Sequence, residues 1–348
     1  MSAEPLPHAI RQLAAGHSLT QEETAQALGA VMAGDGSPAQ VAALLVGLRV
    51  KGETSEEVAG GAEALRRTML RLDAPDPDTL VDTCGTGGGA ITTFNISTAA
   101  ALLAAGAGAR IAKHGNRSFA TRSGSADVLE ALGVKIELSV AAMRTVLDRA
   151  GIVFMFAPLM HPAMRHVGAV RRDIAIPTMM NLLGPLANPA GAGRQVIGVA
   201  DPARVSLVAG ALIALGTKHS LVVHGEPGLD EISPLGCTHV VEIRGRETRE
   251  WTIDPARVGH ATDRADDLVG GSAAENALLL REVLGGQRRD GARAAVLLNA
   301  AAAIYVAGLD PTFESALVRA AEALAAGRGT AALERLRHES DRAAAARD

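Results

Sequence analysis

Cysteine is scarce in this 348-residue sequence, which contains only Cys84 and Cys237, and their spacing matches no metal-binding motif. Two isolated cysteines exclude a framework of structural disulfides and suit a reducing compartment, so we expect a cytoplasmic protein. Long apolar runs are also lacking, since none approaches the roughly 18 residues that a membrane span needs. The opening residues, MSAEPLPHAIRQ, have neither the basic nor the apolar region of a secretory signal.

An excess of positive charge is lacking too. Lys and Arg together number 34 against 38 Asp and Glu, which gives a formal net charge of −4. This balance argues against a general nucleic-acid-binding surface, although a local basic pocket is compatible with it. The length and a hydrophobic content of 48% instead indicate a folded chain with one large domain and a smaller one.

The first seventy residues read as helices with clear starting points. Each start has the capping-box pattern, in which Ser or Thr precedes Glu or Gln by three residues. The pairs are Thr20 with Glu23, Ser37 with Gln40, and Thr54 with Glu57. The proline-broken stretch 73–79, DAPDPDT, cannot continue a helix, so we place a domain boundary there.

Beyond this boundary, short β-type runs alternate with helical patterns, which predicts an α/β sheet covered by helices. The runs are Leu80 to Cys84, Ala109 to Lys113, Val134 to Leu138, Ile152 to Phe156, Gln195 to Ala200, Ser220 to His224 and His239 to Ile243. A helical crossover from about Ser97 to Ala105 joins the first two runs. The polar loops that follow these two strands should therefore lie at the same, C-terminal, edge of a parallel sheet, where such folds bind ligands.

The first of these loops has the composition of an anion site. Gly85, Gly87, Gly88 and Gly89 let backbone N–H groups approach a phosphate closely, and polar side chains follow where a helix begins. The spacing is neither the GxxxxGK[ST] of nucleoside triphosphatases nor the GxGxxG of dinucleotide folds, because no Lys follows the glycines and the helix starts about eight residues after them. A different phosphate ester is implied.

Several motifs in one order resemble the anthranilate phosphoribosyltransferase family, which joins phosphoribosyl pyrophosphate (PRPP) to anthranilate in tryptophan biosynthesis. They are GTGG and TFNIST within 85–98, AKHGNRS at 112–118, SGSADVLEALG at 123–133, HPAMRHVGAVRR at 161–172, NLLGPLANPA at 181–190 and HGEPGLDEIS at 224–233. The resemblance implies a small helical domain over residues 1–72, joined by a returning segment at about 161–188, and a large α/β domain over 73–348. It also implies an active site in the cleft between them and a homodimer.

The resemblance assigns roles residue by residue. PRPP contacts are implied for Gly85, Gly88, Gly89, Thr93, Asn95, Ser97, Thr98, Lys113 and Ser125. Anthranilate contacts are implied for Gly85, His114, Asn116, Arg171, Gly184 and Pro185. Two Mg²⁺ ions, brought with PRPP, are implied at Ser97, Asp230 and Glu231. No acid or base is assigned, because the anthranilate amine is already uncharged at neutral pH.

Taken alone, some of these residues have plainer interpretations. An Asp-Glu pair is commonly a solvated turn, a single Lys a surface residue, and a single His a hydrogen-bonded structural residue. One position departs from the family, which commonly reads GTGGD where this chain has Gly89. The missing carboxylate should alter the dependence on PRPP or Mg²⁺. Cys84, beside the loop, is expected to be a buried strand residue.

Two other functions fit this architecture. Pyrimidine nucleoside phosphorylases share it, but their loop resembles KHSTGGVGDK, whereas this chain reads CGTGGGAITTF. A non-catalytic relative that binds nucleic acid is the second alternative. It would be expected to lose NIST or KHGN and to gain basic surface, and this sequence does neither.

Overall fold

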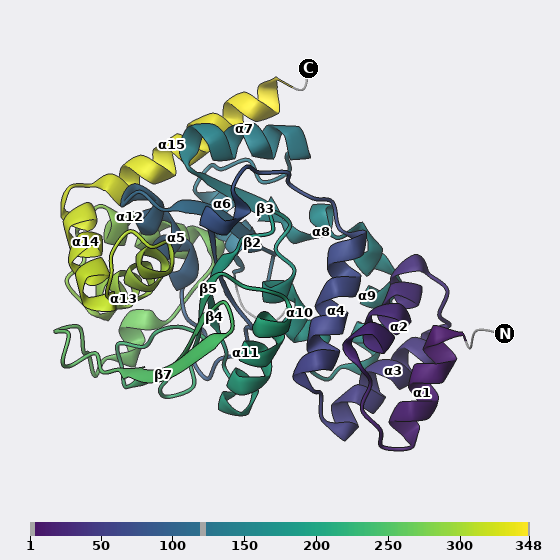
Figure 1. Cartoon of the computed structure of the whole chain (residues 1–348). Coiled ribbons are helices and arrows are strands. Elements are labelled where there is room, and N and C mark those ends of the chain that lie inside the picture. Colours follow the sequence, from purple (N-terminus) through teal and green to yellow (C-terminus); the bar gives the residue numbers. More distant parts are fainter. Residues whose placement is uncertain (1–3, 119–122, 347–348) are drawn as a thin grey trace.

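The structure is a computed structural model that describes residues 4–118 and 123–346. Figure 1 shows a helical part at the N-terminal end of the chain beside a larger α/β part. The helical part begins with α1 (Pro5–Ala14), α2 (Gln21–Ala33), α3 (Pro38–Lys51) and α4 (Ser55–Thr68). The three predicted capping boxes are confirmed, since the side chains of Thr20, Ser37 and Thr54 each accept a hydrogen bond from the N–H three residues on.

The α/β part is built on one seven-stranded sheet with the order β3-β2-β1-β4-β5-β6-β7. The strands are β1 (Leu80–Gly85), β2 (Arg110–Gly115), β3 (Ile152–Phe156), β4 (Arg194–Gly198), β5 (His219–Gly225), β6 (Thr238–Arg244) and β7 (Glu247–Ile253). The first five strands are parallel, and β6 and β7 are antiparallel. The predicted neighbours β1 and β2 are parallel and joined by α5 (Ile96–Gly106), so both polar loops lie at one edge.

The strand predicted at Val134 to Leu138 is wrong. Val134, Ile136 and Leu138 are buried while the residues between them are exposed, but the segment joins no strand of the described chain. The N–H of Lys135 instead donates to the Ser340 hydroxyl at 3.1 Å. Alternating burial requires only one covered face, and here a helix rather than a neighbouring strand covers it.

Strand β7 was not predicted. Its sequence, ETREWTI, is largely exposed, and only its last residue is buried. As the edge strand of the sheet it has one paired side and a polar, charged outer surface, which suppresses the apolar alternation that sequence analysis detects.

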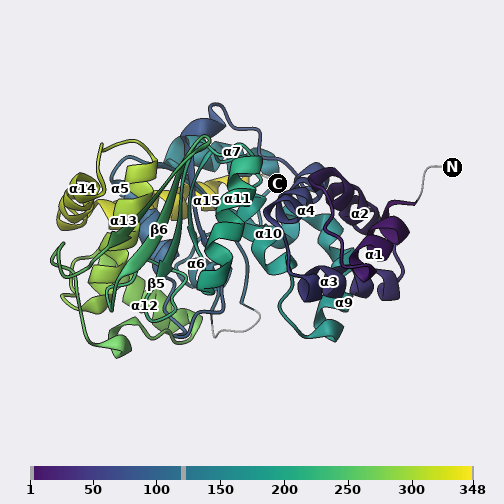
Figure 2. The same ribbon diagram turned by 60° about the horizontal axis from the view of Figure 1, so that its bottom comes forward.

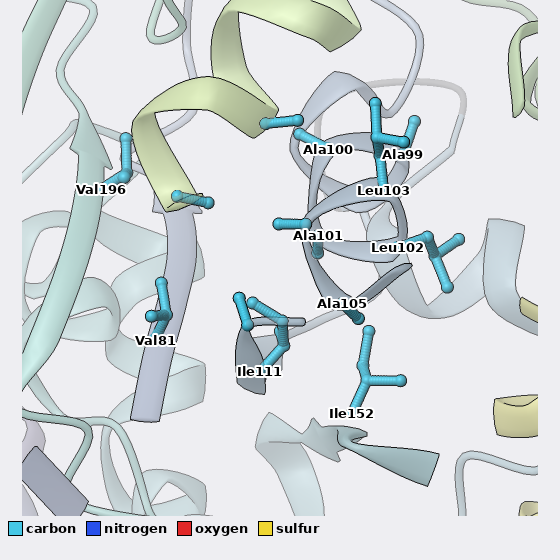
Figure 3. Packing of buried hydrophobic residues seen from close by; sticks show 14 of the residues in the cluster. Val81, Ala99, Ala100, Ala101, Leu102, Leu103, Ala105, Ile111, Ile152 and Val196 are labelled. Atoms are coloured by element: carbon cyan, nitrogen blue, oxygen red, sulfur yellow. The ribbon is translucent and has the colours of Figure 1, made fainter. Parts of the chain in front are cut away.

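Helices cover both faces of the sheet, as Figure 2 shows. One face carries α5 with α6 (Ser125–Ala131), α7 (Val140–Ala150), α12 (Ala273–Leu284), α13 (Gly291–Val306), α14 (Phe313–Ala325) and α15 (Arg328–Ala345). Small side chains let α5 lie close to the strands: Ala100 and Ala101 are buried beside Val81 and Ile111 (Figure 3). This close packing fixes the start of α5 above the end of β1.

The other face carries α10 (Met180–Leu186) and α11 (Val205–Ala214), and its core continues into the helical part. The short α8 (Ala157–Met160) leads to α9 (Arg165–Ile174), which packs against α2 and α3, while α10 packs against α4. We therefore propose that residues 1–72, joined by the returning segment at about 161–188, form the small unit and that the rest of 73–348 forms the large one. No helix in the described ranges is both long and apolar enough to cross a membrane.

Candidate active site

The glycine loop after β1 lies directly against the acidic turn that contains Asp230 and Glu231. The N–H of Gly87 donates to Asp230 Oδ2 at 2.7 Å. A Cβ atom at Gly85 would lie 2.2 Å from the same oxygen, so this contact needs glycine. Gly87 and Gly88 have φ values of +73° and +80°, a backbone conformation that L side chains rarely adopt. The loop is thus shaped to turn backbone N–H groups toward an anion.

Two glycines at neighbouring strand ends let the acidic turn sit on the edge of the sheet. A Cβ at Gly198, the last residue of β4, would lie 1.7 Å from the Asp230 carbonyl oxygen. A Cβ at Gly225, the last residue of β5, would lie 2.4 Å from the Glu231 carbonyl oxygen. Neither glycine could be identified as a site residue from the sequence, because a single glycine at a strand end does not reveal which distant backbone approaches it.

The adjacent carboxyl groups of Asp230 and Glu231 have raised pKa values, so both resist ionisation when no cation is bound. Removal from water and the neighbouring Asp230 raise the pKa of Glu231 to about 8, although Lys113 and the N–H of Ser97 oppose the shift. Removal from water also raises the pKa of Asp230, against the hydrogen bond from Gly87. Paired oxygen ligands of this kind fit Mg²⁺, which relieves the repulsion between them.

Protein ligands alone do not complete a metal site here. Within residues 4–118 and 123–346, no group of three or more His, Cys, Asp or Glu side chains could hold a metal ion. Mg²⁺ commonly binds through one or two carboxylates together with substrate phosphates and water. Asp230 and Glu231 therefore fit an ion that arrives with a phosphorylated substrate.

Lys113 is buried, with 3% of its surface exposed, so the surface interpretation of this residue is wrong. Its ammonium group donates to the carbonyl oxygen of Thr83 and lies 3.3 Å from Ser97 Oγ. The backbone N–H of Ser97 in turn lowers the pKa of Glu231, against the larger effect of burial. A positive charge, a hydroxyl and two carboxylates thus surround the base of the glycine loop.

The start of α5 supplies the remaining polar groups of this side. Asn95 is the N-cap residue, and its side-chain nitrogen donates to the Ser123 carbonyl at 3.2 Å instead of capping the helix. Thr98 is buried, and its hydroxyl has no hydrogen-bond partner among the described residues. Thr93 pairs through its backbone with Val269. Gly89 lies opposite the acidic turn, since its Cβ would lie 3.4 Å from Asp230 Oδ1.

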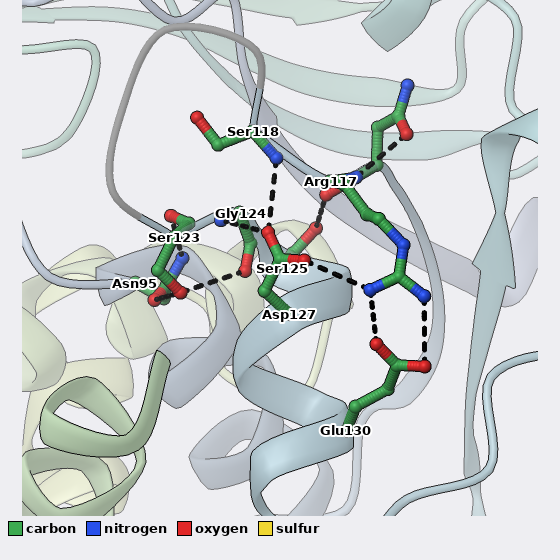
Figure 4. A network of polar contacts seen from close by, with 9 residues as sticks. Asn95, Arg117, Ser118, Ser123, Gly124, Ser125, Asp127 and Glu130 are labelled. Carbon is green, nitrogen blue, oxygen red and sulfur yellow. Dashed lines mark hydrogen bonds and ion pairs between the residues drawn. The ribbon is translucent and has the colours of Figure 1, made fainter. Parts of the chain in front are cut away.

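The second polar loop is held at its two ends by one carboxylate, as Figure 4 shows. Asp127 Oδ2 accepts hydrogen bonds from the N–H groups of Ser118 at 3.2 Å and Gly124 at 2.8 Å. Asp127 also pairs with Arg117, which is bonded to Glu130 as well. Residues 119–122 of this predicted loop lie outside the described residues.

The same loop brings two predicted site residues together. Ser125 donates its hydroxyl to the Asn116 carbonyl at 3.3 Å, and the Asn116 side chain accepts from the Arg117 N–H at 2.7 Å. A Cβ at Gly115 would lie 2.2 Å from Ser125 Oγ, so this glycine makes room for the serine.

His114, near the end of β2, connects this strand to α10. Its Nδ1 lies 3.2 Å from the Gly184 carbonyl oxygen and its Nε2 lies 3.1 Å from Nε2 of His161. Burial and the neighbouring histidine lower the pKa of His114 to about 3, and burial lowers that of His161 to about 4. Both rings are therefore neutral at pH 7, with His114 donating from Nδ1 and accepting at Nε2.

The remaining predicted residues are on the returning segment. The carbonyl of Pro185 accepts from Gln195 Nε2 at 2.7 Å, which ties α10 to β4. Arg171 lies in the last turn of α9 and is partly buried, whereas Arg172 is exposed. Among the described residues, no hydrogen bond or ion pair holds the Arg171 guanidinium. Burial lowers its pKa, and the structure joins it to no other predicted site residue.

Cys84 is not a reactive thiol. Burial, with Asp82 as the next cause, raises its pKa to about 12. The thiolate form, which is the nucleophile, is therefore negligible at neutral pH. Cys84 is a residue of β1, as predicted, but it is partly rather than fully buried.

Comparisons with known proteins agree on one family. Residues 7–69 match the helical bundle domain of a glycosyl transferase family, and residues 77–330 match its a/b domain. The anthranilate phosphoribosyltransferase of Rubrobacter xylanophilus is 49% identical over 97% of this chain and 98% of that protein. The enzyme of the same name from Roseiflexus castenholzii is 47% identical over 95% of this chain and 97% of its own.

Solved structures give the same result. The anthranilate phosphoribosyltransferase of Thermus thermophilus superposes with a TM-score of 0.90 at 40% identity, covering 96% of this chain and 99% of that one. The Saccharomyces cerevisiae enzyme in complex with PRPP and Mg has a TM-score of 0.87 at 26% identity, with 98% and 99% covered. Neither alternative function is favoured by these relatives. The chain belongs to this glycosyl transferase family and, within it, to the anthranilate phosphoribosyltransferases.

Proposed function

We propose that this chain transfers the phosphoribosyl group of PRPP to the amine of anthranilate, releasing pyrophosphate. The observation that carries the proposal is the contact between the glycine loop and the Asp230–Glu231 turn. This contact brings two kinds of group to one edge of the sheet. Backbone N–H groups can donate to phosphate, and carboxylates can bind a cation. Both are needed by a reaction whose leaving group is pyrophosphate.

The pyrophosphate half of the site would be formed by residues on the β1, α5 and β2 side. We assign Gly85, Gly88, Gly89, Thr93, Asn95, Ser97, Thr98, Lys113 and Ser125 to PRPP. As the C1–O bond breaks, negative charge grows on the departing pyrophosphate. Loop N–H groups fixed before the reaction stabilise that charge without reorganising. Thr98 adds a buried hydroxyl for which the described residues offer no other partner.

Asp230, Glu231 and Ser97 would hold Mg²⁺, and we expect two ions per site. The bound metal would neutralise charge on the phosphates of PRPP and on the leaving pyrophosphate. The raised pKa of Glu231 means that this carboxyl group must lose its proton before it can serve as a ligand.

The anthranilate half would be formed by the loop after β2 and the returning segment. We assign Gly85, His114, Asn116, Arg171, Gly184 and Pro185 to anthranilate. The Arg171 guanidinium forms no hydrogen bond or ion pair with the described residues. It is therefore suited to a carboxylate ligand, which it can bind through two parallel hydrogen bonds. The neutral His114 adds no charge beside the uncharged amine, so the chain contributes orientation rather than a base.

Loss of anthranilate fluorescence on mixing purified protein with PRPP and Mg²⁺ tests the proposal. Consumption that requires all three components supports it, and no consumption by folded protein refutes it. Phosphorolysis of thymidine or uridine in parallel would instead support the nucleoside phosphorylase alternative. A gel shift with single- and double-stranded DNA at physiological salt tests the nucleic-acid alternative. We also expect the protein to be cytoplasmic and to form a homodimer. Analytical ultracentrifugation tests the oligomeric state.

A further inference from the structure

Asn95 is held from two sides by groups far from it in the sequence. Its Nδ2 donates to the Ser123 carbonyl at 3.2 Å, and its Oδ1 accepts from Nδ2 of Asn276 at 3.0 Å. Asn276 is 2% exposed and lies in the first turn of α12, and its own Oδ1 accepts from the Gly271 N–H at 2.7 Å. Neither the motifs nor the spacing of the sequence pointed to this residue.

These contacts fix which way both amides point. The Gly271 N–H can only donate, so the atom of Asn276 that faces it must be the oxygen. The nitrogen of Asn276 then faces Asn95, which must present its own oxygen there. The Ser123 carbonyl can only accept, and it meets the nitrogen of Asn95 as this order requires. Backbone groups at both ends therefore determine the orientation of the Asn95 side chain.

The backbone around Asn276 is attached to the same loop. Gly270 donates its N–H to the Thr92 carbonyl, and Phe94 donates to the Leu268 carbonyl, each at 2.9 Å. A Cβ at Gly270 would lie 2.6 Å from the Thr93 carbonyl oxygen. Residues 268–271 thus lie along the end of the glycine loop. Asn276 adds a side-chain contact between α12 and Asn95 that constrains the orientation of the Asn95 amide.

We propose that Asn276 is a positioning residue for PRPP, acting by holding the Asn95 amide with its nitrogen toward Ser123 and the second polar loop. The inference rests on the proposed function, in which Asn95 contacts PRPP. Asn95 uses its oxygen on Asn276 and one N–H on Ser123, which leaves its second N–H for an acceptor such as a phosphate or ribose oxygen. Without Asn276, the amide keeps only its contacts with Ser123, to the carbonyl at 3.2 Å and to the hydroxyl at 3.5 Å, so it is held less firmly in the orientation that presents its nitrogen to this acceptor.

The test is a double-mutant cycle on the KM for PRPP. Asn95→Ala should raise this KM about 10- to 100-fold, the loss expected for a hydrogen bond to a charged ligand. Asn276→Ala should raise it about 3- to 10-fold, as expected for a neutral hydrogen bond. If Asn276 acts through Asn95, the double variant should match Asn95→Ala alone within about twofold. The KM for anthranilate should stay unchanged in all three.

Ser272→Ala is the matched control. It removes the N-cap of the same helix, where Ser272 Oγ accepts from the Glu275 N–H, without touching Asn95. A purely structural role of Asn276 predicts that Ser272→Ala and Asn276→Ala raise the KM for PRPP alike at equal loss of thermal stability. Positioning predicts that only Asn276→Ala raises it.

Equal effects of Ser272→Ala and Asn276→Ala would therefore overturn the proposal, and so would either of two further outcomes. In the first, the effects of Asn95→Ala and Asn276→Ala multiply in the double variant, which would show that Asn276 acts independently of Asn95. In the second, Asn95→Ala leaves the KM for PRPP unchanged, so that Asn276 has nothing to position. The second outcome is distinct from failure of the proposed function, because that variant would still consume anthranilate with PRPP.

Discussion

The contact between Gly85 and Asp230 gives the sharpest prediction. Gly85→Ala would place a Cβ atom 2.2 Å from Asp230 Oδ2, whereas ordinary contacts begin at 3.4 Å. Neither Gly85 nor Gly89 has a positive φ, so alanine can adopt the backbone conformation at both positions. The Asp230 carboxylate must then retreat by about 1 Å and lose its hydrogen bond from Gly87. A displacement of about 1 Å in a reacting site costs about 100-fold in rate.

Gly89→Ala is the matched control in the same loop. Its Cβ would lie 3.2 Å from the Gly228 carbonyl and 3.4 Å from Asp230 Oδ1, so a shift of a few tenths of an ångström suffices. We expect kcat/KM for PRPP to fall about 100-fold in Gly85→Ala and about twofold or less in Gly89→Ala. Steady-state fluorescence assays measure both, and thermal unfolding checks the fold. Equal losses in the two variants would refute the steric reasoning.

Four further predictions concern the two halves of the site. Replacing Asp230 by Asn and Glu231 by Gln should weaken Mg²⁺ dependence and activity at saturating anthranilate; an unchanged Mg²⁺ titration would exclude their role as ligands. Arg171→Ala should raise the KM for anthranilate by about 30- to 1000-fold; an equal PRPP defect would place it elsewhere. Gly89→Asp should shift the PRPP or Mg²⁺ dependence, and identical titrations would show that the missing carboxylate does not matter. Because the pKa of Glu231 is raised to about 8, Mg²⁺ with PRPP should bind more tightly as pH rises from 6 to 8 and level off above it; calorimetry that detects no proton release at pH 7 would contradict this.

Local sequence signals predicted the elements that depend on local interactions. The capping boxes, the α5 crossover and the parallel pair β1–β2 all follow from short patterns and from a helical connection between successive strands. The strand predicted at 134–138 failed because alternating burial does not identify the covering element. Strand β7 was missed because an exposed edge carries few apolar residues.

The parts of the site that consist of short motifs could be predicted from the sequence. The contacts between segments far apart in the sequence could not. The glycine loop and the Asp230–Glu231 pair are recognisable from residue type. The glycines that admit the acidic turn, Gly198 and Gly225, are recognisable only in the fold. Asn276 lies 181 residues from Asn95, and no local pattern relates them. The resemblance to a family supplied assignments such as Arg171 that neither composition nor the described contacts supply.

In the site we describe, phosphoribosyl transfer to anthranilate must release pyrophosphate as the leaving group. The most direct measurement is the simultaneous recording of anthranilate loss and pyrophosphate release by the purified protein, with PRPP, Mg²⁺ or anthranilate omitted in turn. We expect equal amounts of anthranilate consumed and pyrophosphate released, with neither reaction when any component is missing. Pyrophosphate release that is independent of anthranilate, or no anthranilate loss with all components present, would contradict it.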